Sequence, residues 1–154
     1  MMTEQNTPRP FNPHAVAAAQ YALNAAILDD DESAARLIAA ILRDTGMHGV
    51  RDAIVTCCET FQHHTGFPAG TQLDQTYVHP ETGEPIPESE AEPTLVWASH
   101  VIEAYVARDQ ERFETLFRNL GDDPEPVLAH LTEMVEHVAA QVMLADQTRR
   151  AALS

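Results

Sequence analysis

Residues 65–91 interrupt a chain that is otherwise patterned for helices. These 27 residues contain four prolines, three glycines, five acidic residues and no lysine or arginine. Proline inside a helix removes a hydrogen bond and clashes with the preceding turn, and within a sheet it is confined to edges and bulges. We therefore expect a loop here, and one much longer than the roughly two to eight residues that join packed helices.

The centre of this loop can form a small β-hairpin. A short strand, a turn containing Pro80 and Gly83, and a returning strand follow one another in the sequence. Tyr77, Val78 and Ile86 then lie near the middle of an acidic, lysine-free segment, and we expect these three side chains to contact a partner. The same composition also suits a disordered linker, which is the alternative interpretation.

The length of the loop indicates a role beyond joining two helices. If it is a binding surface carried by an independent helical core, replacing residues 70–87 by a short Gly/Ser linker leaves the melting temperature nearly unchanged. The same replacement is expected to abolish association with a partner or with a second copy.

Six helices are predicted on the two sides of the loop, because apolar side chains recur there at three- and four-residue steps. Asn12 and Asp109 suit N-caps, Gly46 and Gly121 suit C-terminal stops, and residues 89–92 have the Ser-x-x-Glu form of a capping box. This apolar pattern is clearest in two predicted helices, the one directly before the loop and the one at the end of the chain. Their predicted core positions are Val50, Ile54, Cys57, Cys58 and Phe61, and Val127, Leu131, Met134, Val135, Val138 and Val142.

The two halves of the chain resemble each other. A shift of 79 residues places Asp30 on Asp109 and Leu37 on Leu116, and it gives both halves the order helix, acidic corner, helix, glycine, helix. The predicted fold is therefore all-α: a six-helix bundle or short helical array built from two pseudo-repeated three-helix halves. The domain spans residues 12–148, with halves 12–64 and 92–148 joined by the loop 65–91. Residues 1–11 are expected to form a flexible arm, and residues 149–154 a frayed end.

The charge of the chain limits its partners. It has 24 acidic residues, nine arginines and no lysine, and its net charge is −15. Such a chain repels phosphate backbones and anionic lipid surfaces, so neither direct nucleic-acid binding nor membrane docking is expected. A basic protein surface is the partner that this charge favours.

The location is expected to be cytoplasmic. No apolar run approaches the ~20 residues that span a bilayer, and the N-terminal residues lack the order of a signal peptide. Cys57 and Cys58 are adjacent, which disfavours an ordinary disulfide between them. We therefore expect reduced thiols, with Cys57 buried and inert.

Eight histidines in a lysine-free chain raise the alternative of a metal site. His63 and His64 precede the loop that carries His79, and together they could form a metal- or ligand-binding cleft, with Cys57 as a further candidate. The last helix offers a second group at steps of three and four residues, which is a spacing that places side chains on one helical face. This group comprises His130, Glu133 and His137.

The structural alternative for the second group is an ordinary polar flank, facing solvent or another subunit. His100 and Glu103 form a similar pair, read in the same way as a polar flank. No Cys-x-x-Cys, phosphate-binding loop, Gly-x-Ser-x-Gly or His-Glu-x-x-His motif occurs in the sequence. No cofactor is predicted, and whether the chain is an enzyme stays open, with catalysis disfavoured.

The function expected from these features is that of a non-catalytic, acidic cytoplasmic interaction or regulatory protein. Its partner is expected to be a protein, with a basic one favoured by charge, and the chain is expected to form a homo-oligomer, most simply a dimer. One alternative is a small-molecule or metal-binding helical domain that uses the His-rich cleft. Another is a DNA mimic that inhibits a basic nucleic-acid-binding protein.

Overall fold

The computed structural model describes residues 10–153, so most of the predicted N-terminal arm lies outside the described residues. Its elements are five α-helices, a two-stranded hairpin and one turn of 3₁₀ helix. The all-α class and the hairpin are as predicted from the sequence, but residues 10–153 form five α-helices and not six. In chain order the elements are α2 (Pro13–Ile27), α3 (Asp31–Thr65), β1 (Tyr77–Val78), β2 (Pro85–Ile86), η1 (Glu88–Glu90), α4 (Pro93–Ala107), α5 (Gln110–Leu120) and α6 (Pro124–Leu153).

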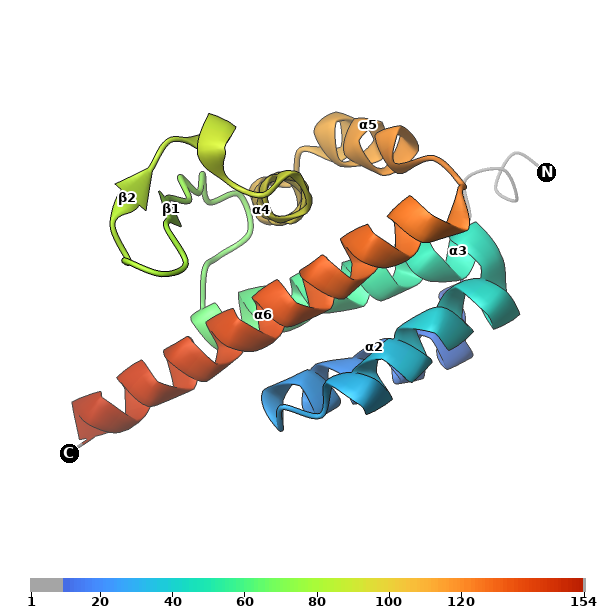
Figure 1. Cartoon of the computed structure of the whole chain (residues 1–154), viewed down its shortest axis with the longest axis horizontal. Coiled ribbons are helices and arrows are strands. Elements are labelled where there is room, and N and C mark those ends of the chain that lie inside the picture. Colours follow the sequence, from blue (N-terminus) through green and yellow to red (C-terminus); the bar gives the residue numbers. More distant parts are fainter. Residues whose placement is uncertain (1–9, 154) are drawn as a thin grey trace.

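The difference in helix number arises at Gly46. The sequence predicts a helix stop there, and Gly46 does have a non-helical backbone, with φ 69° and ψ −165°. The residues on both sides are helical, so α3 consists of two helical segments that meet at Gly46, and its ribbon reverses direction at this point (Figure 1). Gly121, which follows α5, has nearly the same backbone angles, φ 73° and ψ −160°. A positive φ of this size favours glycine, because other residues lose free energy there through contact of Cβ with the backbone.

Side chains at the helix starts satisfy amide groups that have no helical partner. The side chain of Asn12 accepts hydrogen bonds from the amides of His14 and Ala15, as its predicted N-cap role requires. The amide of Asn12 in turn donates to the buried carboxylate of Asp52 at 2.9 Å, which ties the start of α2 to α3. The local sequence thus fixes both where α2 begins and what it packs against.

The predicted capping box over residues 89–92 is not formed. Residues Glu88–Glu90 make a 3₁₀ turn instead, and α4 begins at Pro93 after Glu92, whose side chain makes no capping hydrogen bond. Pro93 sets the helix start, because proline is favoured in the first turn and lacks the amide that a cap would serve.

The corners between paired helices are alike in the two halves. Asp29, after α2, and Arg108, after α4, both have φ 61°, and their positions differ by the predicted shift of 79 residues. The amide of Asp29 donates to the carbonyl of Ala26, and the amide of Arg108 donates to the carbonyl of Tyr105, both at 3.1 Å. These corners support an internal duplication, which stays a prediction.

The core lies where α6 and the second segment of α3 run side by side (Figure 1). α2 packs against both of them, α4 crosses α6, and α5 lies beside α4. All the predicted core positions of the second segment of α3 and of α6 are buried, including Ile54 and Leu131. Leu37 and Leu116, the pair matched by the repeat, pack against this core but are only partly buried. α6 stays helical to Leu153, past the residue at which the sequence indicates fraying.

α3 and α6 are long helices. Even so, among residues 10–153 no helix has the sustained apolar stretch that crossing a bilayer requires.

Candidate functional site: the docked acidic hairpin

The predicted hairpin is present within the long loop. Tyr77 pairs with Ile86 and Val78 pairs with Pro85 in antiparallel register. The turn between the strands is closed by two backbone hydrogen bonds of 2.8 Å, one from the amide of His79 to the carbonyl of Glu84 and one from the amide of Gly83 to the carbonyl of His79. Gly83 has φ 72°, a conformation that glycine adopts without strain.

The chain that leads into the hairpin is attached to the helices at several points. The ring of Phe67 stacks on Phe61 with 6.2 Å between centroids. The amide of Gly70 donates to the carbonyl of Val106 on α4 at 2.7 Å, and Leu73 packs against the core. This segment therefore does not behave as a free linker, because its side chains and backbone are used in packing.

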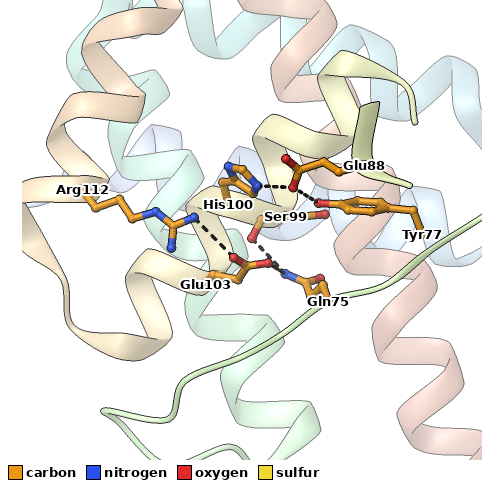
Figure 2. A network of polar contacts seen from close by, with 7 residues as sticks. All are labelled: Gln75, Tyr77, Glu88, Ser99, His100, Glu103 and Arg112. Carbon is orange, nitrogen blue, oxygen red and sulfur yellow. Dashed lines mark hydrogen bonds and ion pairs between the residues drawn. The ribbon is translucent and has the colours of Figure 1, made fainter. Parts of the chain in front are cut away.

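Glu88 joins the hairpin to α4. One of its carboxylate oxygens accepts a hydrogen bond from the Tyr77 hydroxyl at 3.4 Å and lies 2.7 Å from Nε2 of His100 (Figure 2). The Tyr77 side chain is 8% exposed, so its ring is used in packing as well as in hydrogen bonding. The contact fixes the start of β1 and the 3₁₀ turn after β2 to one place on α4.

Gln75 connects the same segment to α4 and α6. Its Nε2 donates to the carbonyl of Ser99 at 2.9 Å and to the carboxylate of Glu103 at 3.3 Å, both on α4. The same Glu103 pairs with Arg112 of α5 at 3.4 Å, as Figure 2 shows. On its other side, the amide oxygen of Gln75 lies 3.3 Å from Nε2 of His137 on α6.

Burial shifts the pKa values of two residues in this network, Tyr77 and His137. Burial raises the pKa of Tyr77, with the hydrogen bond to Ser99 opposing the shift and Glu88 and Glu103 adding to it. Burial also lowers the pKa of His137. A neutral His137 must donate from Nε2, since the amide oxygen of Gln75 can only accept.

The shifted pKa of His137 predicts a dependence of stability on pH. A histidine whose folded-state pKa is depressed stabilises the fold above its ordinary pKa of about 6.5, and this contribution is lost as the pH falls through the folded-state value. We expect the free energy of unfolding of the wild type to fall more between pH 7 and pH 5 than that of His137→Gln. Denaturant titrations at the two pH values measure the difference. His48→Gln, at an exposed position, is the control and should follow the wild type; an equal loss in His137→Gln would contradict the prediction.

The outer surface of the segment is acidic. Asp74, Glu81, Glu84, Glu90 and Glu92 are exposed, as is most of Glu88. Of the predicted contact residues, Val78 is 53% exposed, Ile86 is partly buried, and Tyr77 faces inward. The segment thus exposes several carboxylates and the side chain of Val78, while Gln75, Tyr77 and Glu88 are bonded to the helices.

The predicted His-rich cleft does not assemble. The rings of His63 and His64 meet edge to face with 5.3 Å between centroids, and His64 lies 3.5 Å from Asp146 on α6. His79 lies in the hairpin turn, where its Nδ1 accepts from the amide of Glu81. No group of three or more potential metal ligands occurs among residues 10–153.

The second group, on α6, has separate partners. His130 hydrogen-bonds the carbonyl of Pro126 at 2.6 Å and contacts Trp97, Glu133 accepts from Thr94, and His137 meets Gln75. The interpretation of this flank as solvent-facing or intersubunit is wrong for His137, which is partly buried and meets Gln75 of the loop. Its three side chains serve packing between α6, α4 and the loop.

Cys57 and Cys58 are both fully buried, free thiols. Burial raises the pKa of Cys57 to about 12 and raises that of Cys58 as well. Thiolate formation is therefore suppressed at both positions, which supports the expectation that Cys57 is inert.

The sequence did not predict several residues of the polar network that holds the hairpin against α4 (Figure 2). His100 and Glu103 carried a signal, their three-residue spacing, but were interpreted as an outward polar flank. Gln75, Glu88 and Arg112 carried no local signal, because their partners lie up to 62 residues away in the sequence.

Comparison with known proteins gives no relative: no family model, no curated protein and no solved structure matches this chain. The hairpin and its anchors are therefore the observations from which a function can be argued.

Proposed function

We propose that this chain is a non-catalytic, acidic cytoplasmic binding protein whose docked hairpin contacts a basic surface on a partner protein. The observation that carries the proposal is the division of the hairpin into two faces. Its inward face is bonded to α4 and α6 through Gln75, Tyr77 and Glu88. Its outward face is a row of exposed carboxylates with no lysine or arginine among residues 65–91.

Anchoring supports a recognition role, because a fixed surface loses less conformational entropy on binding than a mobile one. A plain connection between α3 and α4 needs neither the hairpin nor its contacts to α4 and α6. The carboxylates attract a basic surface over distances up to the Debye length, about 8 Å at physiological salt. Val78, which is exposed at the hairpin, supplies apolar area of the kind that is buried at the centre of an interface.

The polar groups that could suggest catalysis are engaged with neighbours in the same network. His100 is paired with Glu88, and the buried Ser99 lies beneath Tyr77 and Gln75. These contacts support a structural role for the network. A homodimer stays a separate prediction, which the exposed Leu144 and Leu153 on the projecting end of α6 support.

The proposal is tested by capturing partners from a lysate of the source cells on three immobilised proteins. They are the wild type, Glu81→Gln/Glu84→Gln in the hairpin, and Glu111→Gln/Glu125→Gln as a control with the same change of charge at exposed positions on α5 and α6. We expect a basic protein, identified by mass spectrometry, to be retained by the wild type and the control, released as salt rises, and not retained by the hairpin variant.

Retention of the same proteins by all three baits would contradict the proposal. If the captured protein binds nucleic acid and is displaced by DNA, the DNA-mimic alternative applies to the same hairpin.

A further inference from the structure

A second surface feature lies away from the hairpin, between α3, α4 and α5. It is a cavity of about 420 Å³, within the range of small-molecule sites. Its floor is apolar, formed by Val55, Ala104 and Phe113, all of them buried. The rings of Phe11 and Tyr105 also line it.

Two of the nine arginines of this acidic chain line the cavity. The guanidinium of Arg51 lies over the ring of Phe113, 5.5 Å from its centroid, and it is paired with Glu114. The guanidinium of Arg108 lies over the ring of Tyr105, 4.7 Å from its centroid. Cations are therefore placed beside apolar and aromatic surface, where a bound anion would be partly shielded from water.

Arg108 is held by neutral groups. It donates to the carbonyl of Tyr105 at 2.7 Å and to the side-chain oxygen of Gln62 at 3.1 Å. Within residues 10–153 it takes part in none of the ion pairs, unlike Arg51 and Arg112. Among these residues its guanidinium is thus held beside the cavity by uncharged acceptors and by no ion pair.

The backbone of Arg108 adds to this argument. Its φ of 61° and ψ of 33° lie in the left-handed region, which favours glycine at the end of a helix. A side chain at such a position costs free energy relative to glycine, as it also does at Asp29. At Arg108 the hydrogen bonds to Tyr105 and Gln62 hold the guanidinium beside the cavity.

Acidic groups also lie at the rim, but they are turned to other partners. Glu59 accepts from the Tyr105 hydroxyl at 3.3 Å. Asp109 is the N-cap of α5 and accepts from the amide of Arg112 at 3.1 Å. Among residues 10–153, the cation at this cavity that takes part in no ion pair is that of Arg108.

We propose that this cavity binds a small carboxylate with an apolar, ring-sized body, its carboxylate on Arg108 and its body against the floor formed by Val55, Ala104 and Phe113. This site is independent of the hairpin. A guanidinium binds a planar carboxylate through two parallel hydrogen bonds, and the apolar floor favours a ring over a bare anion.

Phenylacetate is a suitable probe, with acetate and phenylacetamide as controls that remove the ring and the charge, respectively. Titrations of isotope-labelled full-length protein should show saturable shifts of the Tyr105 and Phe113 signals with phenylacetate. Acetate and phenylacetamide should bind at least about tenfold more weakly, since each lacks one of the two interactions.

Two substitutions separate loss of the site from loss of the fold. Arg108→Gln should weaken phenylacetate binding at least about tenfold. Arg108→Gly should do the same while the helical signal is retained, because glycine adopts the left-handed backbone without strain. Arg36→Gln, in an exposed pair with Glu32, and the hairpin variant Glu81→Gln/Glu84→Gln should bind as the wild type does.

Wild-type affinity in either Arg108 variant would overturn the proposal, and so would unchanged Tyr105 and Phe113 signals at saturating phenylacetate. Equal affinity for phenylacetate and acetate would overturn the assignment of the apolar floor.

Discussion

Leu131→Ala is expected to lower the free energy of unfolding by about 2–5 kcal/mol, the range for a buried leucine truncated to alanine. Leu131 is completely buried on α6, the helix that packs against α2, α3 and α4. The alanine leaves a cavity where these helices meet, and total stabilities are only about 5–15 kcal/mol. Chemical denaturation measures the change.

Leu144→Ala is the matched control on the same helix. Leu144 is 55% exposed, so the same truncation should change the free energy of unfolding by less than about 0.5 kcal/mol. A loss at Leu144 as large as that at Leu131 would mean that the projecting end of α6 is part of the core.

Replacing residues 74–87 by a Gly/Ser linker of equal length is the second large change. It removes the packing of Tyr77 and the anchors of Gln75 while holding the length of the loop constant. We expect the free energy of unfolding to fall by about 2–3 kcal/mol, the scale of one large side chain taken out of burial. The melting temperature should fall by roughly 5–10 °C, with the helical circular-dichroism signal retained.

This expectation corrects the one made from the sequence, in which a linker leaves the melting temperature nearly unchanged. The correction follows from the inward position of Tyr77, which the sequence suggested as a partner contact. An unchanged melting temperature would show that the hairpin contacts do not stabilise the helices, and retention of the partner would move the binding surface elsewhere.

Local rules predicted much of the fold. The caps at Asn12 and Asp109, the backbone change at Gly46, and the turn of the hairpin each depend on a few neighbouring residues. The core positions of α6 could be predicted because one face of a long helix is buried over its whole packed length.

The candidate site was less predictable, because its contacts join distant parts of the chain. Whether His137 faces solvent depends on where the loop lies, and the loop is positioned by Gln75, 62 residues earlier. Likewise, Glu88 and His100 have no periodic pattern that would pair them. Such polar contacts depend on tertiary packing, which helical periodicity does not encode.

The central claim is that the acidic hairpin is held in one place before any partner binds, and amide hydrogen exchange of the free protein tests it most directly. The amides of Gly70, His79 and Gly83 donate backbone hydrogen bonds to Val106, Glu84 and His79. We predict that these three amides exchange far more slowly than the same amides in an isolated peptide of residues 65–91, because exchange requires the hairpin to open. Exchange at the rate of the peptide would show a mobile segment and contradict the account.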